Sequence, residues 1–286
     1  MAIPSSNQHT DKYEVRPGQS TELLKELHIL TRDGKMNQDS RRKLKQVFHL
    51  VQFIEPIMLE VDQQQPTFNL VDFGAGKSYL GFMLYDLVAK SLQHPFQLIG
   101  IDMRADLVEY SQKLAARIGF DQMAFFQLDS AQSLQAPQLP EKIDIVTALH
   151  ACNTATDDAI AFALHKQAPH IILVPCCQAE LASLLKTKKS HALKNNYFSA
   201  LWRYPIHTRE FGSHLTNVLR CLFLESQGYD VTVTELVGWE HSMKNELIIA
   251  RKKTSPLQSS KALEQLKSLL LEFNLESLAP RFQIHL

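Results

Sequence analysis

The sequence has few cysteines, no excess of charge and no long apolar run. Its four cysteines are not spaced like a disulfide framework, which favours a reducing compartment. Lysine plus arginine and aspartate plus glutamate both number 30, so no overall charge attracts the chain to nucleic acid or to an acidic membrane. The apolar runs are too short to span a bilayer, and the first residues lack a secretory pattern. We therefore expect a cytoplasmic protein with no membrane association and no obligate protein partner.

The chain has the composition of a globular protein, and predicted strands alternate with predicted helices along it. Hydrophobic residues make up 45% of it and charged residues 21%, which is typical of a protein with a core. Short, β-branched apolar runs alternate with helical patterns and predict five strands at 68–73, 96–102, 123–129, 143–150 and 170–175. This alternation is typical of right-handed βαβ units in a buried parallel sheet. Two more strands, at 229–239 and 245–253, would add an antiparallel edge and give an α/β sheet of seven strands.

Composition and periodicity also divide the chain into segments. Residues 1–19 are polar and are predicted to be a flexible arm. Residues 20–64 are predicted to be an N-terminal helical segment whose first helix spans 20–30. The α/β domain is predicted over 65–253, with an insertion at 182–212 that is followed by a helix at 213–228. Residues 254–286 are predicted to form a C-terminal helical tail.

A glycine-rich turn follows the first predicted strand, in the stretch VDFGAGKSYL that begins at Val71. A P-loop would need glycine in place of Val71, and a dinucleotide fingerprint would need it in place of Tyr79. The remaining functional interpretation is the acidic-x-Gly-x-Gly turn that binds S-adenosylmethionine (SAM). Asp72 would then hold the amino acid end of SAM, beside Gly74 and Gly76. On this motif alone, an ordinary turn is an equally good explanation.

Acidic residues also end the next two predicted strands. Asp102 could accept hydrogen bonds from ribose hydroxyls, or it could cap the helix that follows. Asp129 could accept from the adenine amino group, and the neighbouring Met103 and Ser130 are candidates for the same pocket. Together with Asp72, these strand-end acids follow the order that class I methyltransferases use, so we predict SAM as the cofactor.

Two further motifs follow the fourth and fifth strands: LHAC at 149–152 and CC at 176–177. With them the chain resembles a methyltransferase domain shared by three protein groups. These are the eukaryotic tRNA acceptor-stem 2′-O-methyltransferases, the methyltransferase-like proteins and the glutathione S-transferase C-terminal domain-containing proteins. The resemblance spans about residues 40–253 and implies a Rossmann-like, class I SAM-dependent methyltransferase. Members usually carry glycine where this chain has Asn153, and the tRNA enzymes carry zinc elements that this sequence lacks.

Four interpretations compete for His150, Cys152, Cys176 and Cys177, which should meet at the carboxyl edge of the sheet. They could simply pack there, with His150 as a wall of the SAM pocket. One thiolate could be a nucleophile toward a pyrimidine, or the adjacent thiols could serve redox regulation. A zinc site is also conceivable, but adjacent cysteines ligate one metal awkwardly, so no metal is predicted.

Three more residues are catalytic candidates. Asp157 begins the helix after the fourth strand, where it could orient a substrate group or only complement the helix dipole. His241 and Lys244 lie between the last two strands and could serve as a base for a hydroxyl substrate. The alternative for this pair is a solvated hairpin turn.

Basic residues are concentrated locally despite the neutral total. One group lies in the N-terminal helical region, at Lys35, Arg41, Arg42, Lys43 and Lys45. The insertion carries another together with aromatic residues, including Lys186, Lys188, Lys189, Trp202 and Arg203. Such a mixture suits phosphate contacts and base stacking, although a solvated lysine-rich helix is the plainer alternative. RNA, as tRNA or rRNA, is the leading substrate; a small molecule, a protein side chain or a catalytically silent SAM-fold module are the alternatives.

Overall fold

The structure is a computed structural model, and it describes residues 15–149, 154–175, 179–187, 200–201, 203–235, 246–254 and 259–286. Its centre is a seven-stranded sheet in the order β3-β2-β1-β4-β5-β7-β6. The strands are β1 (Phe68–Phe73), β2 (Phe96–Asp102), β3 (Met123–Gln127), β4 (Ile145–Leu149), β5 (His170–Val174), β6 (Tyr229–Glu235) and β7 (Glu246–Lys252). β1 to β5 pair in parallel, and β7 runs antiparallel to both of its neighbours. The predicted fold class is confirmed.

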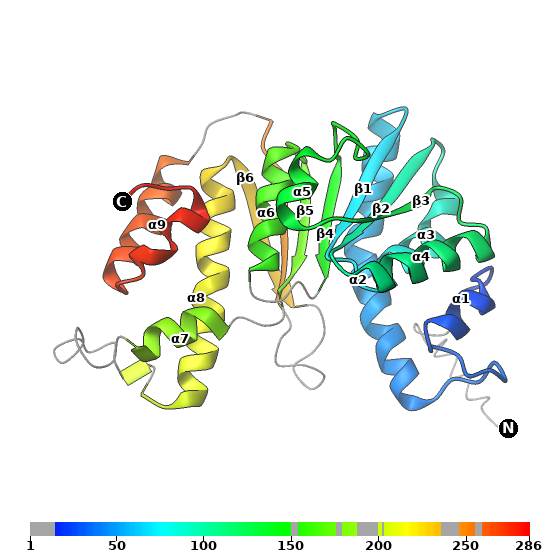
Figure 1. Ribbon diagram of the computed structural model, residues 1–286, viewed down its shortest axis with the longest axis horizontal. Coiled ribbons are helices and arrows are strands. Elements are labelled where there is room, and N and C mark those ends of the chain that lie inside the picture. The colour runs from blue at the N-terminus through cyan, green and yellow to red at the C-terminus, as the bar shows by residue number, and fades with distance from the viewer. Residues whose placement is uncertain are drawn as a thin grey trace, which may run out of the picture.

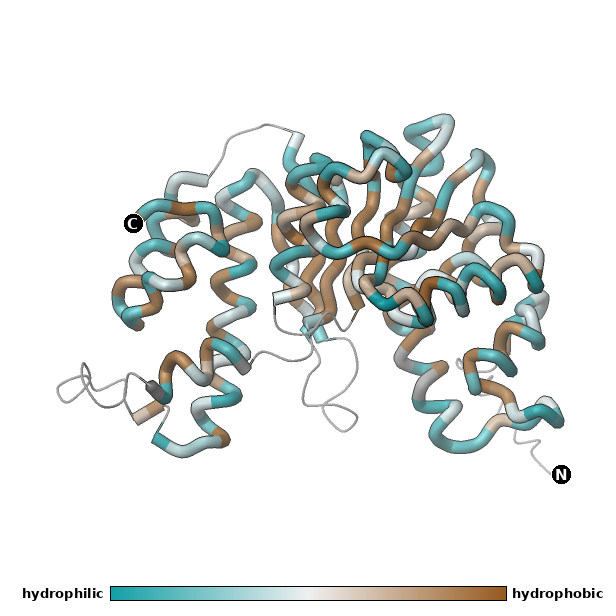
Figure 2. Tube along the Cα trace, in the orientation of Figure 1, coloured by the Kyte–Doolittle hydropathy of each residue, from teal (hydrophilic) through white to brown (hydrophobic). Residues whose placement is uncertain are grey.

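The strands at the centre of the sheet are mainly apolar because both faces of the sheet are covered there (Figures 1 and 2), whereas the edge strand β6 is largely exposed. In β1, Leu70 belongs to one core and the next residue, Val71, to the other, as alternation along a strand requires. The core that contains Leu70 is closed by α2 (Gln38–Gln64), α3 (Tyr79–Val88) and α4 (Ala105–Ile118). The core that contains Val71 is closed by α6 (Ala155–His165), α8 (Pro205–Ser226) and α9 (Ser260–Glu272).

The N-terminal helical segment consists of the short α1 (Thr21–Glu26) and the long α2. Ser20 caps α1 by accepting a hydrogen bond from the backbone N–H of Leu23 at 3.1 Å. The helical pattern predicted a longer first helix, to residue 30, but α1 ends at Glu26. His28 then adopts a left-handed φ of 55°, which is incompatible with a continuing right-handed helix.

Beyond β5 come α7 (Ala179–Thr187) and α8. The pattern predicted a helix from residue 213, but α8 begins earlier, at Pro205, and continues to Ser226. Proline suits the first turn of a helix because its missing N–H would have no partner there. A 3₁₀ segment (Glu276–Phe282) ends the C-terminal part after α9.

Two helical projections reach past the carboxyl ends of the strands, on opposite sides of the sheet (Figure 1). One consists of α1 with the start of α2, and the other consists of α7 with the start of α8. Among the described residues, no helix is both long enough and apolar enough to span a bilayer.

Candidate functional site

The turn after β1 has an unusual backbone. Gly74, Gly76 and Ser78 all have positive φ, at 69°, 60° and 50°. This conformation strains residues that carry a Cβ atom, which explains the two glycines. A Cβ atom placed on Gly74 or Gly76 would meet no heavy atom within 4 Å. The turn therefore leaves open space beside its backbone before the chain enters α3, as the prediction of a ligand-binding turn requires.

Asp102, at the end of β2, holds this turn in place. Its Oδ2 accepts a hydrogen bond from the backbone N–H of Gly76 at 2.7 Å, and its Oδ1 accepts from that of Arg104 at 2.9 Å. The helix-capping alternative is wrong, because the N-cap of α4 is Arg104 and no side chain caps this helix. Each carboxylate oxygen can accept more than one hydrogen bond, so ribose hydroxyls remain compatible with this arrangement.

Asp72 lies in β1 beside Thr147 of β4, and its side chain is buried. The Thr147 hydroxyl donates to Asp72 Oδ1 at 2.9 Å. Burial raises the pKa of Asp72 to about 7, and the nearby Asp102 carboxylate acts in the same direction, against the hydrogen bond from Thr147. No cationic side chain of the described part of the chain offsets this effect. The site therefore contains a buried acid that a bound cation would complement.

The third strand-end acid, Asp129, has a local structural role. β3 ends at Gln127, and Asp129 caps the short helix α5 (Ser130–Gln135). Its Oδ1 accepts from the backbone N–H of Gln132 at 2.7 Å, and the Gln132 side chain completes a capping box. Ser130 donates to Asp158 at 3.0 Å. Asp129 is exposed, so its contact with adenine stays a prediction that is compatible with capping.

Met103 directly follows Asp102, and 71% of it is exposed. A single exposed apolar side chain is common on protein surfaces, but this one lies beside the strand-end acids and offers an apolar surface there. This position suits the predicted contact with the adenine ring, which presents flat apolar faces.

Asp157 is engaged within the fold. It forms a bidentate ion pair with Arg220 of α8, at 2.7 Å from Nε to Oδ1 and 3.0 Å from Nη2 to Oδ2. The exposed fractions of the two side chains are 8% and 1%. Arg281 lies 3.6 Å from the same carboxylate and 2.6 Å from Glu180 of α7. We therefore assign Asp157 to the packing of α6 against α8 and leave it out of the proposed catalytic residues.

Several predicted site residues lie outside the described part of the chain. They are His150, Cys152, Cys176, Cys177, His241 and Lys244, together with Lys188, Lys189 and Trp202 of the insertion. Their roles stay predictions.

Sequence reasoning missed two residues at this edge of the sheet. Thr147 is a single polar residue in the apolar strand IVTAL, and Arg220 is a single charge in the apolar helical stretch NVLRCLFL. A lone polar residue in an apolar run was the available signal, since buried polar groups almost always have partners.

Comparison with known proteins shows the family to which the chain belongs. A family model described as a methyltransferase domain matches residues 42–184. The chain belongs to this methyltransferase family. It therefore contains a methyltransferase domain, for which SAM is the cofactor.

Curated relatives share this region at low identity. The glutathione S-transferase C-terminal domain-containing protein of Bos taurus is 24% identical over 239 residues, which cover 77% of this chain and 35% of the relative. The homologue from Drosophila melanogaster is 25% identical over 213 residues, which cover 67% of this chain and 34% of the relative. The chain thus spans about a third of the length of these relatives.

Solved structures also match over much of the chain. Magnesium protoporphyrin IX methyltransferase from Synechocystis PCC 6803, solved with bound SAH, matches with a TM-score of 0.46 and 17% identity, over 82% of this chain and 96% of that one. A fibrillarin/Nop5p complex matches with a TM-score of 0.43 and 12% identity, over 66% of this chain and 74% of that one.

The described residues fit SAM. The amino acid end of SAM carries an ammonium group, which would complement the buried, uncompensated carboxyl of Asp72. The open side of the turn at Gly74 and Gly76 leaves room for a ligand next to the backbone. Asp102 and Met103 supply hydrogen-bond acceptors and an apolar surface on the adjacent strand end.

Proposed function

We propose that this methyltransferase acts on RNA, with tRNA or rRNA as the leading candidates, and that it works in the cytoplasm. The observation that carries the proposal is an exposed group of rings and cations at the start of α8. The Tyr204 and His207 rings lie 5.5 Å apart at 90°, and the Arg203 guanidinium lies 5.7 Å from the centre of the Tyr204 ring. Aromatic faces and guanidinium planes are what unpaired RNA bases stack on.

This group lies on a helical projection that reaches past the carboxyl edge of the sheet (Figure 1). Tyr204 is 54% exposed, and Lys186 of α7 on the same projection is also exposed. A base that stacks on these rings would thus be held on the side of the sheet where the strand-end acids lie. The predicted contacts of Lys188, Lys189 and Trp202 belong to the same proposal.

SAM supplies an electrophilic methyl group when it is bound. We assign its amino acid end to Asp72, its ribose to Asp102 and its adenine to Met103 and Asp129, with Ser130 and His150 at the rim. For the acceptor, His241 and Lys244 are the proposed base for a hydroxyl oxygen. For Cys152, Cys176 and Cys177, three roles stay open: packing at the edge of the sheet, a nucleophilic thiolate, or redox regulation.

The test is methyl transfer from labelled SAM into an extract of cells that lack this gene. The extract is separated afterwards into RNA, protein and small-molecule fractions. Label in nuclease-sensitive material is the expected result, and digestion to nucleosides would identify the methylated atom. Label only in another fraction would overturn the RNA proposal. If SAM binds and no fraction is labelled, the silent binding module is favoured instead.

Two variants make this test specific. The double variant Tyr204→Ala/His207→Ala removes the stacking surface and should raise KM for RNA while SAM binding stays unchanged. Asp102→Ala should instead weaken SAM binding, because the glycine turn loses its acceptor. If the α8 variant loses no activity toward RNA, this surface does not bind the substrate.

A further inference from the structure

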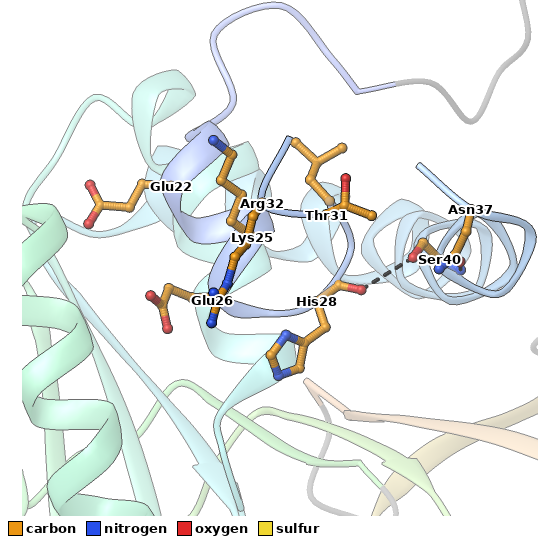
Figure 3. Close-up of a pocket in the computed structure, with 9 residues that line it drawn as sticks. Glu22, Lys25, Glu26, His28, Thr31, Arg32, Asn37 and Ser40 are labelled. Atoms are coloured by element: carbon orange, nitrogen blue, oxygen red, sulfur yellow. Dashed lines mark hydrogen bonds between the residues drawn. The ribbon is translucent and has the colours of Figure 1, made fainter. Parts of the chain in front are cut away.

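A pocket lies in the other helical projection, between α1 and the start of α2 (Figure 3). Its volume is about 570 Å³, within the range of roughly 300–1,000 Å³ that is common for ligand pockets. The pocket contains none of the strand-end acids of the SAM site. Figure 3 shows the carboxylates of Glu22 and Glu26 toward one end, Asn37 and Ser40 toward the other, and basic side chains between them.

The two carboxylates of the pocket are already paired. Arg117 of α4 lies 3.1 Å from Glu22 and 2.6 Å from Glu26. In contrast, Lys25 and Arg32, which line the same pocket, form no ion pair with any described residue. After this pairing, no described acidic residue neutralises the Lys25 ammonium or the Arg32 guanidinium, so the uncompensated charge of the pocket is positive.

The basic character continues beyond the rim of the pocket. Arg41 and Arg42 follow on the exposed face of the first turns of α2, and Lys35 is exposed in the preceding loop. Over residues 15–50 the sequence has eight basic and four acidic residues, although the whole chain is balanced. The basic residues are Arg16, Lys25, Arg32, Lys35, Arg41, Arg42, Lys43 and Lys45, and the acidic ones are Glu22, Glu26, Asp33 and Asp39.

From this arrangement we infer that the α1–α2 pocket binds a phosphate group of the RNA backbone, an inference that rests on the proposed function. A guanidinium presents a planar set of donors that matches phosphate oxygens, and an ammonium adds a compact charge. His28 and Thr31 supply further polar groups to the same lining. The exposed Arg41 and Arg42 continue the positive surface for neighbouring phosphates, as binding to a polyanion requires.

The position of the pocket supports RNA rather than a free nucleotide as the source of the phosphate. The projection that carries the pocket lies past the carboxyl ends of the strands, opposite the projection that carries Tyr204 (Figure 1). A chain that stacks on α8 and is gripped at α1 would cross the edge of the sheet between them. A single free nucleotide could occupy only one of the two surfaces.

The pocket is also connected to the SAM turn. Tyr110 of α4 donates from its hydroxyl to Glu26 at 3.4 Å, and Lys77, next to Gly76, lies over the Tyr110 ring at 5.4 Å. Glu26 is at once a wall of the pocket and the acceptor in this contact. Three side chains, those of Glu26, Tyr110 and Lys77, therefore connect a ligand in the pocket with the glycine turn.

The experiment compares the double variant Lys25→Gln/Arg32→Gln with the wild-type chain. The matched control is Lys261→Gln/Lys267→Gln, which removes the same charge from α9. Binding of a fluorescein-labelled total tRNA fraction is followed by anisotropy at several KCl concentrations, and binding of AMP by calorimetry. Lys25 and Arg32 are exposed, so the variant should fold, and an unchanged SAM-induced thermal shift would verify this.

The pocket variant should bind tRNA about tenfold more weakly, and its slope of log K against log salt should fall by about 0.7 to 0.9, the value expected for one lost phosphate contact. The control variant should match the wild-type chain. Equal tRNA affinity in the pocket variant and the wild type would overturn the inference, even if RNA is methylated. If the wild type binds AMP but no tRNA, and the pocket variant loses AMP, the pocket binds phosphate and both RNA proposals are wrong.

Discussion

Replacing Asp72 with Asn should stabilise the protein in the absence of SAM and remove its response to SAM. The Asp72 side chain is buried, and Thr147 donates a hydrogen bond to it. Asparagine keeps an oxygen that can accept this bond and carries no charge that must be removed from water. It also has no charge to offer the ammonium group of SAM.

The size of the effect follows from the pKa. Burial raises the pKa of Asp72 from 3.8 to about 7, and one pKa unit corresponds to about 1.4 kcal/mol. At pH 8 the ionised Asp72 therefore costs roughly 4 kcal/mol of folding free energy. Because the folded pKa lies above the unfolded one, the contribution of Asp72 to stability is complete below about pH 4 and is lost as the pH rises through about 7. The advantage of Asp72→Asn should accordingly be largest at pH 8 and vanish near pH 4.

Urea denaturation at pH values between 4 and 8, with and without SAM, measures both the stability of the free protein and its stabilisation by SAM. At a SAM concentration of about 100 times Kd, the wild-type chain should gain about 2.7 kcal/mol at pH 8. The Asp72→Asn variant should gain nothing.

Asp62→Asn is a matched control. The exposed fraction of Asp62 equals that of Asp72, but the pKa of Asp62 is lowered and that of Asp72 is raised. Burial alone would raise the pKa of Asp62, but the backbone N–H groups of Gln93 and His94 donate to it at 2.9 and 3.0 Å, and with the His94 ring they lower it. Its replacement should destabilise the protein by about 1–3 kcal/mol and leave the SAM response intact. If Asp72→Asn is less stable than the wild type at pH 8, the reasoning on burial is wrong.

Three further substitutions test the packing of the protein. Arg220→Met should cost about 3–5 kcal/mol in urea denaturation, because it leaves the buried Asp157 without its bidentate partner. Arg117→Met breaks only exposed pairs and should cost less than about 1 kcal/mol; similar losses for both would contradict this distinction. Gly100→Ala should cost about 1–3 kcal/mol, because its Cβ would lie 2.6 Å from the Phe125 ring. An unchanged urea midpoint would mean that the ring moves aside without cost.

Much of the fold could be predicted because it depends on local patterns. The alternation of apolar strands with helices predicted all seven strands, and β1 and β2 have the predicted bounds. The errors lie where one residue changes the local conformation. His28 turns left-handed, so α1 ends before residue 30, and Pro205 starts α8 before the predicted residue 213.

The candidate site was predictable in position but not in contacts. Parallel topology alone brings Asp72 and Asp102 to one edge of the sheet. Their partners depend on tertiary packing: Thr147 is 75 residues from Asp72, and Gly76 is 26 residues from Asp102. Asp157 is the clearest example of a contact that the sequence does not reveal. Its position in the first turn of a helix predicted an interaction with the helix dipole, whereas its ion-pair partner Arg220 lies 63 residues away in the sequence.

Both helical projections are tied to elements that begin next to the predicted site. On one side, both Asp86 oxygens of α3 accept from the backbone N–H of Ser20 at 3.1 Å, which fixes the start of α1 to the helix that follows the glycine turn. On the other side, Arg281 joins Glu180 of α7 to Asp157 of α6, and these two helices follow the CC and LHAC motifs. A substrate that moves either projection must therefore strain contacts at the base of the site. This coupling implies that substrate binding and the geometry of the SAM turn depend on each other, as linkage requires of any two sites that share a structural element.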